Sequence, residues 1–523
     1  MKKFISLLLV AGLLLAMSGA FAEGESASGL LTDEPVTITY MRAENSAIPV
    51  QDDVASTRQI LERTGIDLEI IAVPGSDYNT RMMALYAAND MPDIFGLFNM
   101  TKREMVEDGA LLCLTDLLEE YAPNIMAYYE QYPELWRTTV DGEIYSLPQI
   151  RVDQNLEAGC VPFIRTDLLE EAGLDAPTSW EELADVLETL CETYDVGGWA
   201  ARGTGRILGD DDYSWMNSFG ADFTTYMDGE GVWHLGMIEP EYKDAILYLK
   251  DLVERGTLDE EWLTTSTAEW QEKLSSGRFI FFYDNPTFAS GINTALSAID
   301  PDARFEPLPL LESPYGTIQS YKQPTHYVDT FYVNADTENP ELLVKFLNWC
   351  YSEEGAITFG YGREGETYYI DENGDSQWLP EILEKYANAE DAYYQASSDM
   401  GVNNGYFCPA WMNLTIEVFR TSSNPDEITA QYIYDFYEED LNDGTIVERQ
   451  ILPPLTEAQD AEIQVIKQDI WDLAKTEFAA FVMGTRPIEE YDAFIEELVA
   501  LGAQDWAEIL NEAEAAHQEQ LAA

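Results

Sequence analysis

The sequence predicts an α/β protein with an α-rich C-terminal part. A strand, a helix and a second strand follow one another near the start of the chain, at 36–41, 53–63 and 67–73. Strand patterns return at 279–283 and 327–333, whereas the last quarter of the chain repeats apolar residues at helical spacing. Because a strand–helix–strand unit places its two strands in parallel, we expect a parallel sheet in the first part of the chain.

The elements of the first part are bounded by glycine and proline. Gly65 stops the helix at 53–63, and a further helix is predicted over 78–88. Pro92 then ends one element, and a short apolar strand begins at Ile94. A turn at Asp141-Gly142 leads into another short strand that reaches Leu147-Pro148.

Capping residues predict the helices in the middle of the chain. Thr166 is the expected N-cap of a helix within 164–174, with Gly173 in its ending turn. Ser179 and Glu182 form an S-x-x-E capping box before a run of leucine and valine at helical spacing. Further helices are predicted over 242–254, which is followed by Gly256, and from Asn339-Pro340 onward.

The C-terminal quarter reads as long helices. Thr456 and Gln459 cap a segment whose apolar residues recur at helical spacing as far as Phe481, and Gly484 closes it. A further helix carries Phe494 and ends near Gly502. These signals predict the α-rich C-terminal part.

Composition limits the class of protein and its partners. A chain of 523 residues with 46% hydrophobic residues is globular and long enough for two or more lobes with full cores. Its formal net charge is −69, spread along the sequence. Such a field repels phosphate backbones and anionic lipid headgroups, so nucleic acid is excluded as a partner. The acidity also serves solubility, and it does not identify a ligand.

The first 22 residues have the order of a secretory signal peptide. Lys2 and Lys3 precede an apolar run from Phe4 to Met17, and Ala20-Phe21-Ala22 supplies the small residues of a cleavage site. We expect cleavage near Ala22 and export to the periplasm or to the extracellular or cell-surface space. No cysteine stands at this junction to carry a lipid, and 23–34 read as a flexible leader.

Metal and cofactor signals are weak. Oxygen donors at 371–375 imitate the start of a calcium loop, but Ser376 and Ile382 replace the required glycine and glutamate, which favours a hairpin turn. Asp210-Asp211-Asp212 fits a solvated loop or a cation site. We predict no metal and no cofactor. The five cysteines lack metal-ligand spacing, and most are expected to be buried small hydrophobes: Cys113, Cys160, Cys191, Cys350 and Cys408.

A series of motifs, in this order along the chain, resembles one family. They are Arg63-Thr64-Gly65-Ile66, Pro92-Asp93-Ile94, 141–148, 164–169, Ala172-Gly173-Leu174, 177–183, Gly256-Thr257-Leu258-Asp259, 362–368 and the tail 484–502. The chain resembles the extracellular solute-binding proteins that deliver sugars and oligosaccharides to ABC transporters, in family 1 and its long lipoprotein-type branch. It departs from that branch in lacking the lipobox cysteine and in having Tyr491 where tryptophan is usual.

This resemblance implies a two-lobed periplasmic-binding-protein type II fold. The first lobe would comprise 35–148 and 315–352, and the second 149–314 and 353–523. It also implies a receptor rather than an enzyme, which captures a carbohydrate between the lobes and delivers it to the permease subunits of an ABC importer. We expect an oligosaccharide as ligand for a chain of this length, and a monomer.

Candidate ligand residues follow from where strands end, because ligands of open α/β sheets bind at the carboxyl ends of strands. Sugars present apolar C–H faces and hydroxyl rims, so their sites combine aromatic rings with side chains that make paired hydrogen bonds. Eight residues are selected on these two grounds. Those expected after strands are Arg42, Glu44, Asn99, Tyr283 and Asp284, and those in the segment 212–217, which combines aromatic and polar residues, are Asp212, Tyr213 and Trp215. Packing inside the core is the rival role for any aromatic residue, and it is the expected one for Trp180 and Trp349 within helix patterns.

A secreted carbohydrate-active hydrolase is the alternative class of function. The sequence contains neither a nucleophile elbow nor a zinc-binding HExxH motif. Catalytic carboxylate pairs carry no information here, since 97 acidic residues allow such a pair to be drawn anywhere. The predicted mechanism therefore requires binding alone.

Overall fold

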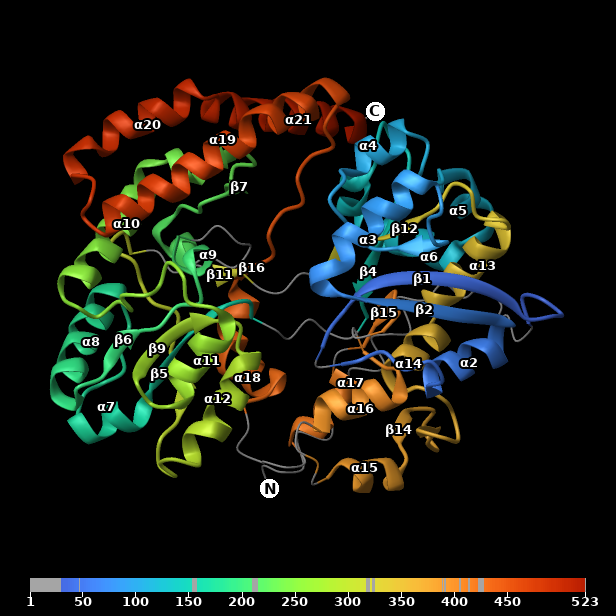
Figure 1. Cartoon of the computed structure of the whole chain (residues 1–523), viewed down its shortest axis with the longest axis horizontal. Coiled ribbons are helices and arrows are strands. Elements are labelled where there is room, and N and C mark those ends of the chain that lie inside the picture. The colour runs from blue at the N-terminus through green and yellow to red at the C-terminus, as the bar shows by residue number, and fades with distance from the viewer. Residues whose placement is uncertain are drawn as a thin grey trace. The chain divides into compact units, whose positions relative to one another are not determined.

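The computed structural model describes residues 30–46, 48–152, 158–208, 215–316, 320–321, 325–387, 389, 392–403, 406–412, 414–421 and 428–522 (Figure 1). The chain forms two compact units. The first comprises Met1–Asn155 and Thr325–Glu427, and the second comprises Leu156–Pro324 and Ile428–Ala523. The predicted signal peptide and most of the predicted leader lie outside the described residues.

The first unit is built on a six-stranded sheet in the order β15-β4-β12-β3-β1-β2. Strand β1 pairs in parallel with β2 and β3, so the predicted strand–helix–strand opening is confirmed. Strand β12 is antiparallel to both β3 and β4. The strands are β1 (Val36–Glu44), β2 (Ile66–Pro74), β3 (Ile94–Phe95), β4 (Ser146–Arg151), β12 (His326–Val333) and β15 (Ala410–Trp411), with the separate hairpin β13 (Tyr368–Ile370) and β14 (Ser376–Trp378).

Helices cover this sheet and close its core. Ile38, Ile94 and Phe331 from the strands pack with apolar residues of α5, α6 and α13. The helices are α2 (Ala55–Thr64), α3 (Gly75–Ala88), α4 (Lys102–Glu107), α5 (Thr115–Tyr121), α6 (Pro123–Gln131), η1 (Pro133–Thr138), α13 (Pro340–Cys350), α14 (Glu353–Tyr361), α15 (Pro380–Tyr386), α16 (Ala392–Met400) and α17 (Leu414–Thr421). Gly65 ends α2 at φ +79°, where a Cβ would lie 2.8 Å from Thr32 Cγ2, so glycine is required there.

The second unit contains a four-stranded sheet in the order β10-β5-β9-β6. Its strands are β5 (Val161–Arg165), β6 (Gly197–Trp199), β9 (Phe279–Asp284) and β10 (Phe305–Pro307). Two small pairs accompany it: the antiparallel β7 (Thr225–Met227) and β8 (Trp233–Leu235), and the parallel β11 (Ser320–Tyr321) and β16 (Ile446–Val447). The strands predicted over 279–283 and 327–333 are confirmed as β9 and β12.

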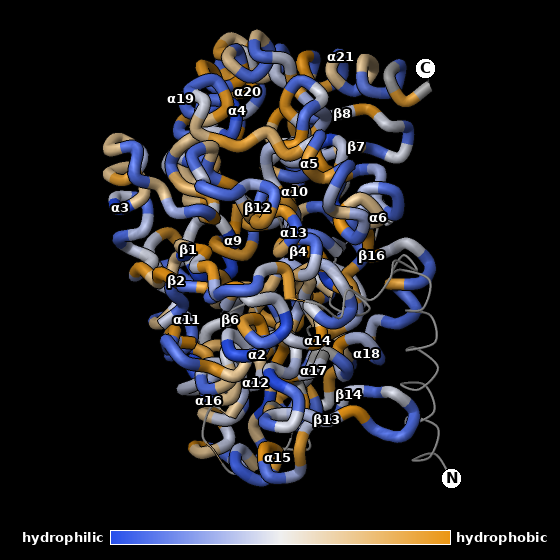
Figure 2. Tube along the Cα trace, turned by 90° about the vertical axis from the view of Figure 1, so that its right-hand side faces the viewer, coloured by the Kyte–Doolittle hydropathy of each residue, from blue (hydrophilic) through white to orange (hydrophobic). Residues whose placement is uncertain are grey.

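Helices make up the rest of the second unit. They are α7 (Thr166–Ala172), α8 (Trp180–Tyr194), α9 (Thr204–Leu208), η2 (Trp215–Phe219), η3 (Gly236–Ile238), α10 (Pro240–Glu254), α11 (Thr267–Ser275), α12 (Thr287–Ser297), α18 (Ala430–Asp443), α19 (Glu457–Val482), η4 (Ile488–Glu490), α20 (Tyr491–Ala500) and α21 (Ala503–Ala522). The predicted α-rich C-terminal part is confirmed. Figure 2 shows hydrophobic and hydrophilic segments alternating along these helices, as expected for helices that bury one face.

Side-chain caps set the starts of two predicted helices. Thr456 Oγ1 accepts the Gln459 N–H, and the Gln459 side chain accepts the Thr456 N–H, which confirms the capping box of α19. Ser179 Oγ likewise accepts the Glu182 N–H at α8. The Glu182 carboxylate also accepts the N–H and the hydroxyl of Thr178. The local signal therefore located both helix starts.

The helix predicted within 164–174 is shorter than expected. Ile164 and Arg165 belong to β5, because they pair with β9 and β10, and α7 begins at Thr166. Thr166 is thus the first helical residue rather than the N-cap, and its hydroxyl donates to Glu306 at 2.6 Å. Gly173 ends the helix in the left-handed conformation, as predicted.

The two units differ from the predicted lobes chiefly over 353–427, which lies in the first unit. Strand β15 pairs with β4, and Ala55 of α2 joins a cluster with apolar residues of α15, α16 and α17. The boundaries also shift because β4 extends to Arg151 against β12, and β11 pairs with β16 in the second unit. The family resemblance implied that 353–427 belongs to the second lobe, whereas long-range pairing places this segment in the first unit.

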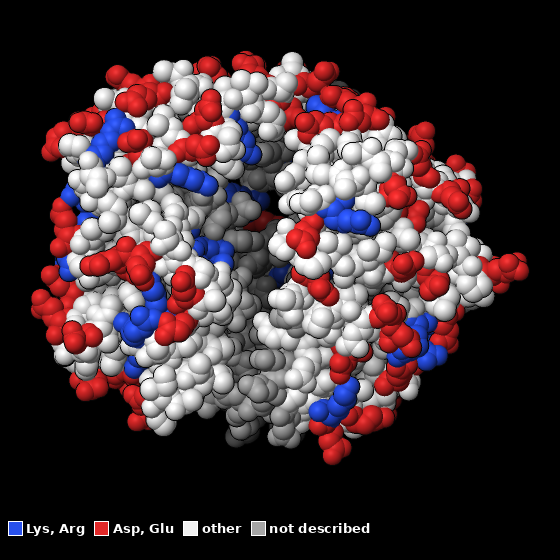
Figure 3. Space-filling model, viewed as in Figure 1, with Lys and Arg blue, Asp and Glu red and all other residues white. Residues whose placement is uncertain are grey.

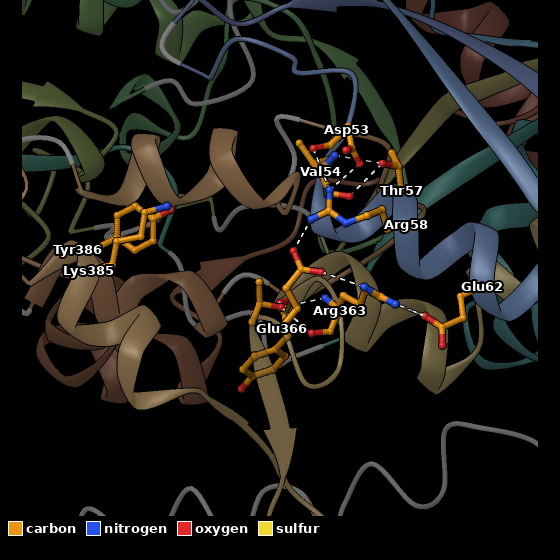
Figure 4. Close-up of polar contacts among 11 residues, drawn as sticks. Asp53, Val54, Thr57, Arg58, Glu62, Arg363, Glu366, Lys385 and Tyr386 are labelled. Atoms are coloured by element: carbon orange, nitrogen blue, oxygen red, sulfur yellow. Dashed lines mark hydrogen bonds and ion pairs between the residues drawn. The ribbon is translucent and has the colours of Figure 1, made fainter.

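Ion pairs add to this attachment (Figure 4). Arg58 of α2 contacts both Asp53 and Glu366, and Arg363 contacts Glu366 and, at 2.8 Å, Glu62. Burial opposes ionisation of Glu366, but hydrogen bonds from Arg58 and Arg363 outweigh it and lower the pKa of that carboxyl. The network links α2 to the loop before β13.

Candidate functional site

Three predicted site residues lie at or just beyond the ends of strands in the first unit. Arg42 and Glu44 stand at the end of β1, and Asn99 lies shortly beyond β3. Because β1 and β3 are parallel neighbours, their carboxyl ends meet the same edge of the sheet. The structure thus brings elements carrying all three residues to one edge, with Asn99 exposed and the other two half-buried.

Backbone groups hold the two charged residues at this edge. Arg42 Nη1 donates to the Tyr406 carbonyl at 2.6 Å, and Glu44 Oε1 accepts the Val50 N–H at 3.1 Å. Burial raises the pKa of the neighbouring Tyr40 to about 12, although the Arg42 charge partly offsets it. Both charged side chains are therefore oriented before any ligand arrives.

Sequence reasoning missed Arg151 in the same unit. Arg151 ends β4, is buried, and places its guanidinium 4.5 Å from the ring centre of Trp411 on β15. Its Nη2 donates to Tyr327 Oη at 3.3 Å. The only sequence signal was an arginine that ends an otherwise mostly apolar strand.

In the second unit, Asp284 ends β9 and anchors an arginine. Its carboxylate accepts two hydrogen bonds from Arg202, from Nε at 2.7 Å and from Nη2 at 2.9 Å, and Arg206 Nε lies 3.7 Å away. The Arg202 guanidinium carbon also lies 4.9 Å from the ring centre of Phe288 and 5.8 Å from that of Trp270. This group combines a paired hydrogen-bonding site with aromatic rings, and neither arginine was predicted.

Tyr283 and Trp215 are both buried. The Tyr283 hydroxyl lies 3.3 Å from Ser320 Oγ of β11. Trp215 is 1% exposed, its Nε1 donates to the Ile207 carbonyl, and its ring centre lies 4.9 Å from that of Trp180 and 5.4 Å from that of Trp199. These contacts account for the burial of Trp215. Ligand contact by Tyr283 or Trp215 stays a prediction. Asp212 and Tyr213 lie outside the described residues.

A second arginine–aspartate pair, also missed, lies elsewhere in this unit. Arg449 contacts the carboxylate of Asp222, which is buried, and donates to Thr224 Oγ1 at 2.7 Å. Its guanidinium carbon stands 5.1 Å from the ring centre of Tyr321 on β11. Arg449 therefore contacts both a carboxylate and an aromatic ring beside strands β11 and β16.

The described residues contain no group of three or more His, Cys, Asp or Glu that could hold a metal ion. The predicted hairpin turn at 371–375 is confirmed, since β13 and β14 pair antiparallel and Asp371 Oδ1 accepts the N–H groups of Asn373 and Asp375. Asp210-Asp211-Asp212 lies outside the described residues.

Burial governs the chemistry of most of the cysteines. All five cysteines lie within the described residues and form no disulfide, and three of them are buried: Cys160, Cys350 and Cys408. Burial raises the pKa of the Cys408 thiol to about 12 and that of Cys191 to about 11. Because the thiolate is the reactive form, these thiols are unsuited to nucleophilic chemistry.

The surface reflects the acidic composition. On the face in view, Figure 3 shows many acidic side chains on both units, with lysine and arginine in scattered groups among them. Across the parts of the chain that the structure describes, no helix combines the length and the apolar character needed to cross a bilayer.

Both α/β units place hydrogen-bonding groups beside aromatic rings near the ends of their strands. This combination is suited to binding a solute and indicates the class of solute-binding proteins. Residues 49–357 match the family model described as bacterial extracellular solute-binding protein. The match covers more than half of the chain, so the chain belongs to that family, and the resemblance predicted from sequence is confirmed.

Three related proteins share low sequence identity with this chain. The chain is 26% identical to the lipoprotein LipO of Bacillus subtilis, over 57% of this chain and 59% of that protein. It is 22% identical to the fructooligosaccharide ABC transporter substrate-binding protein FusA of Streptococcus pneumoniae, over 64% of each chain. It is 24% identical to the polygalacturonan/rhamnogalacturonan-binding protein YtcQ of B. subtilis, over 58% of this chain and 61% of that protein. The chain thus spans about three-fifths of the length of these relatives.

Solved structures show the same fold over nearly the whole chain. The alginate-binding protein AlgQ2 is 20% identical, with a TM-score of 0.73 over 93% of this chain and 99% of that one. FusA of S. pneumoniae in complex with kestose is 18% identical, with a TM-score of 0.70 over 93% and 100%. The predicted class, a two-lobed α/β solute-binding fold, is confirmed.

Proposed function

We propose that this protein is the substrate-binding receptor of an ABC importer, which captures a carbohydrate outside the cytoplasm and presents it to membrane permease subunits. The family match over 49–357 carries the proposal. The names of FusA, YtcQ and AlgQ2 support a carbohydrate ligand, since each protein is described as binding or transporting such a molecule. An oligosaccharide is the proposed ligand.

The chemistry of the strand ends fits a carbohydrate. Arg202 and Asp284 lie beside Phe288, and Arg151 lies over Trp411, so aromatic faces and hydrogen-bonding groups occur together. Micromolar binding requires about 8 kcal/mol, while a net hydrogen bond contributes about 0.5–1.5 kcal/mol. Several such bonds with one or two aromatic contacts suffice, and binding needs no covalent step.

The proposed ligand residues are Arg42, Glu44, Asn99, Asp212, Tyr213, Trp215, Tyr283 and Asp284. The proposal also includes export with the signal peptide removed near Ala22, action as a monomer, and the absence of catalysis, metal and cofactor. A secreted hydrolase would differ in releasing product, which makes the two functions separable by experiment.

A ligand screen tests the proposal. The melting temperature and tryptophan fluorescence are measured with 1-kestose, maltotriose, trigalacturonate and an alginate trisaccharide, and the sugars are analysed afterwards by chromatography. A ligand at 100 times its Kd stabilises the folded state by about 2.7 kcal/mol, so the melting temperature rises for a true ligand. Tyr283→Ala is expected to weaken binding, whereas Tyr369→Ala, on the exposed β13 hairpin, serves as the control.

Two results would contradict the proposal. Cleavage of a sugar would favour the hydrolase. Absence of any shift with all four sugars, in a protein whose melting transition is cooperative, would remove carbohydrate capture as the function.

A further inference from the structure

Asn217 is a buried amide without a hydrogen-bonding partner. It lies in η2 and is 4% exposed. Its backbone carbonyl accepts the Gly220 N–H, but neither Oδ1 nor Nδ2 of its side chain has a partner among the described residues. Within that part of the chain, no other residue has two buried side-chain atoms in this state.

Such an amide is unfavourable in a folded protein. Each buried polar atom has lost its hydrogen bonds to water, and most buried polar atoms in native structures recover a partner. Asn293 in the same unit shows the usual solution. Its Nδ2 donates to the Phe305 carbonyl at 2.9 Å, and its Oδ1 accepts the Phe305 N–H at 2.8 Å. Asn217 makes no such structural contribution.

The geometry of η2 separates Asn217 from the core-facing residues. Residues three apart share a face of a 3₁₀ helix, so Trp215 and Ser218 share one face and Met216 and Phe219 another. The first face packs against α8, where Trp180 Nε1 donates to Ser218 Oγ at 2.8 Å. Asn217 therefore belongs to the third face.

The surroundings of η2 supply further ligand-type groups. The segment lies against β11 in the same unit, and β11 carries Tyr321. The Arg449 guanidinium stands over the Tyr321 ring and is bound to the buried Asp222 (Figure 1 shows the β11–β16 pair). An aromatic ring, a charge-assisted pair and an unsatisfied amide thus belong to neighbouring elements.

We propose that Asn217 is a ligand-binding residue that recognises two adjacent hydroxyl groups of a neutral sugar ring. An amide offers one donor group and one acceptor, and hydroxyls both donate and accept, so a vicinal diol satisfies both atoms at once. A carboxylate would satisfy only Nδ2, since an ionised carboxylate cannot donate. The hydroxyls of a bound sugar supply the hydrogen bonds that both amide atoms lack among the described residues. The inference rests on the proposed carbohydrate receptor.

The test substitutes Asn217 by leucine, which has a similar volume and no polar atoms. We expect the ligand-free melting temperature of Asn217→Leu to rise by about 2 °C, because the buried polar group is removed. We also expect the Kd for the neutral probes 1-kestose or maltotriose to rise about tenfold, equivalent to about 1.4 kcal/mol. The matched control Asn293→Leu should lower the melting temperature and leave the Kd unchanged.

The combination of a more stable free protein and weaker binding separates a ligand residue from a structural one. A lower ligand-free melting temperature for Asn217→Leu would overturn the inference, because it would show that the amide stabilises the fold. An unchanged Kd for a neutral sugar that binds the wild type would also overturn it, while leaving the receptor function intact. Failure of all sugars to bind the wild type would instead remove the proposed function on which the inference rests.

Discussion

The Asp284–Arg202 pair is a buried contact of the second unit whose loss should be costly. Asp284 is 1% exposed and Arg202 is 20% exposed. The carboxylate accepts Arg202 Nε at 2.7 Å, Arg202 Nη2 at 2.9 Å and the Asn285 N–H at 2.7 Å. In Asp284→Asn one acceptor becomes an NH₂ group, which faces N–H donors, and Arg202 loses its counter-charge.

Breaking a buried ion pair by removing one partner costs about 3–5 kcal/mol. Because one-fifth of Arg202 reaches solvent, water stabilises part of its charge, and we expect the lower end, about 3 kcal/mol. A loss of 1 kcal/mol lowers the melting temperature of a unit of this size by about 2–4 °C. The predicted decrease is therefore about 6–12 °C.

Urea denaturation and calorimetry measure both quantities, with Asp492→Asn as the matched control. Asp492 contacts Lys243 at 2.6 Å, close to the shortest Asp284 contact, but Asp492 is 85% exposed. Exposed pairs contribute little and are screened by salt, so the control should lose less than about 1 kcal/mol. If Asp284→Asn lost no more than Asp492→Asn, burial would not set the strength of the Asp284 pair.

Two further predictions concern the same unit. Trp215→Ala should lower the free energy of unfolding by about 3–5 kcal/mol, because it empties a space between Trp180 and Trp199; a loss below about 1 kcal/mol in urea denaturation would contradict this packing. Burial opposes charge on His234, but hydrogen bonds that its ring donates to Asp228 and Glu239, each at 3.0 Å, raise its pKa above the ordinary 6.5. The stabilisation from these contacts is therefore full below pH 6.5 and is lost as pH rises through the higher folded-state pKa. His234→Gln should therefore lose stability relative to wild type at about pH 5 and much less at about pH 9, and a difference independent of pH would contradict it.

Much of the fold was predictable because its signals are local. The capping side chains of Ser179 and Thr456 mark the helices that the structure contains, and Gly65 and Gly173 end theirs in the left-handed conformation. These interactions involve residues only a few positions apart, so the sequence pattern already contains both partners.

The candidate site was less predictable, because its partners are distant in sequence. Asp284 was proposed from its place after a strand, but Arg202 precedes it by 82 residues and carries no motif. Trp215 looked like a ligand-binding aromatic from its polar neighbours, whereas its ring lies among Trp180, Trp199 and Phe219. No sequence pattern indicates that the Asn217 side chain lacks a hydrogen-bonding partner, since that is a property of the folded chain.

The sequence by itself determined the class of fold, the family, the acidic character of the chain, and the positions of most helices and strands. These depend on periodicity, composition and contacts between near neighbours. Only the tertiary structure decided that 353–427 joins the first unit, that Arg165 belongs to a strand, and which charged residues form pairs. The reason is physical: strand pairing, burial and ion pairing bring together groups far apart along the chain, and no local pattern records which groups meet.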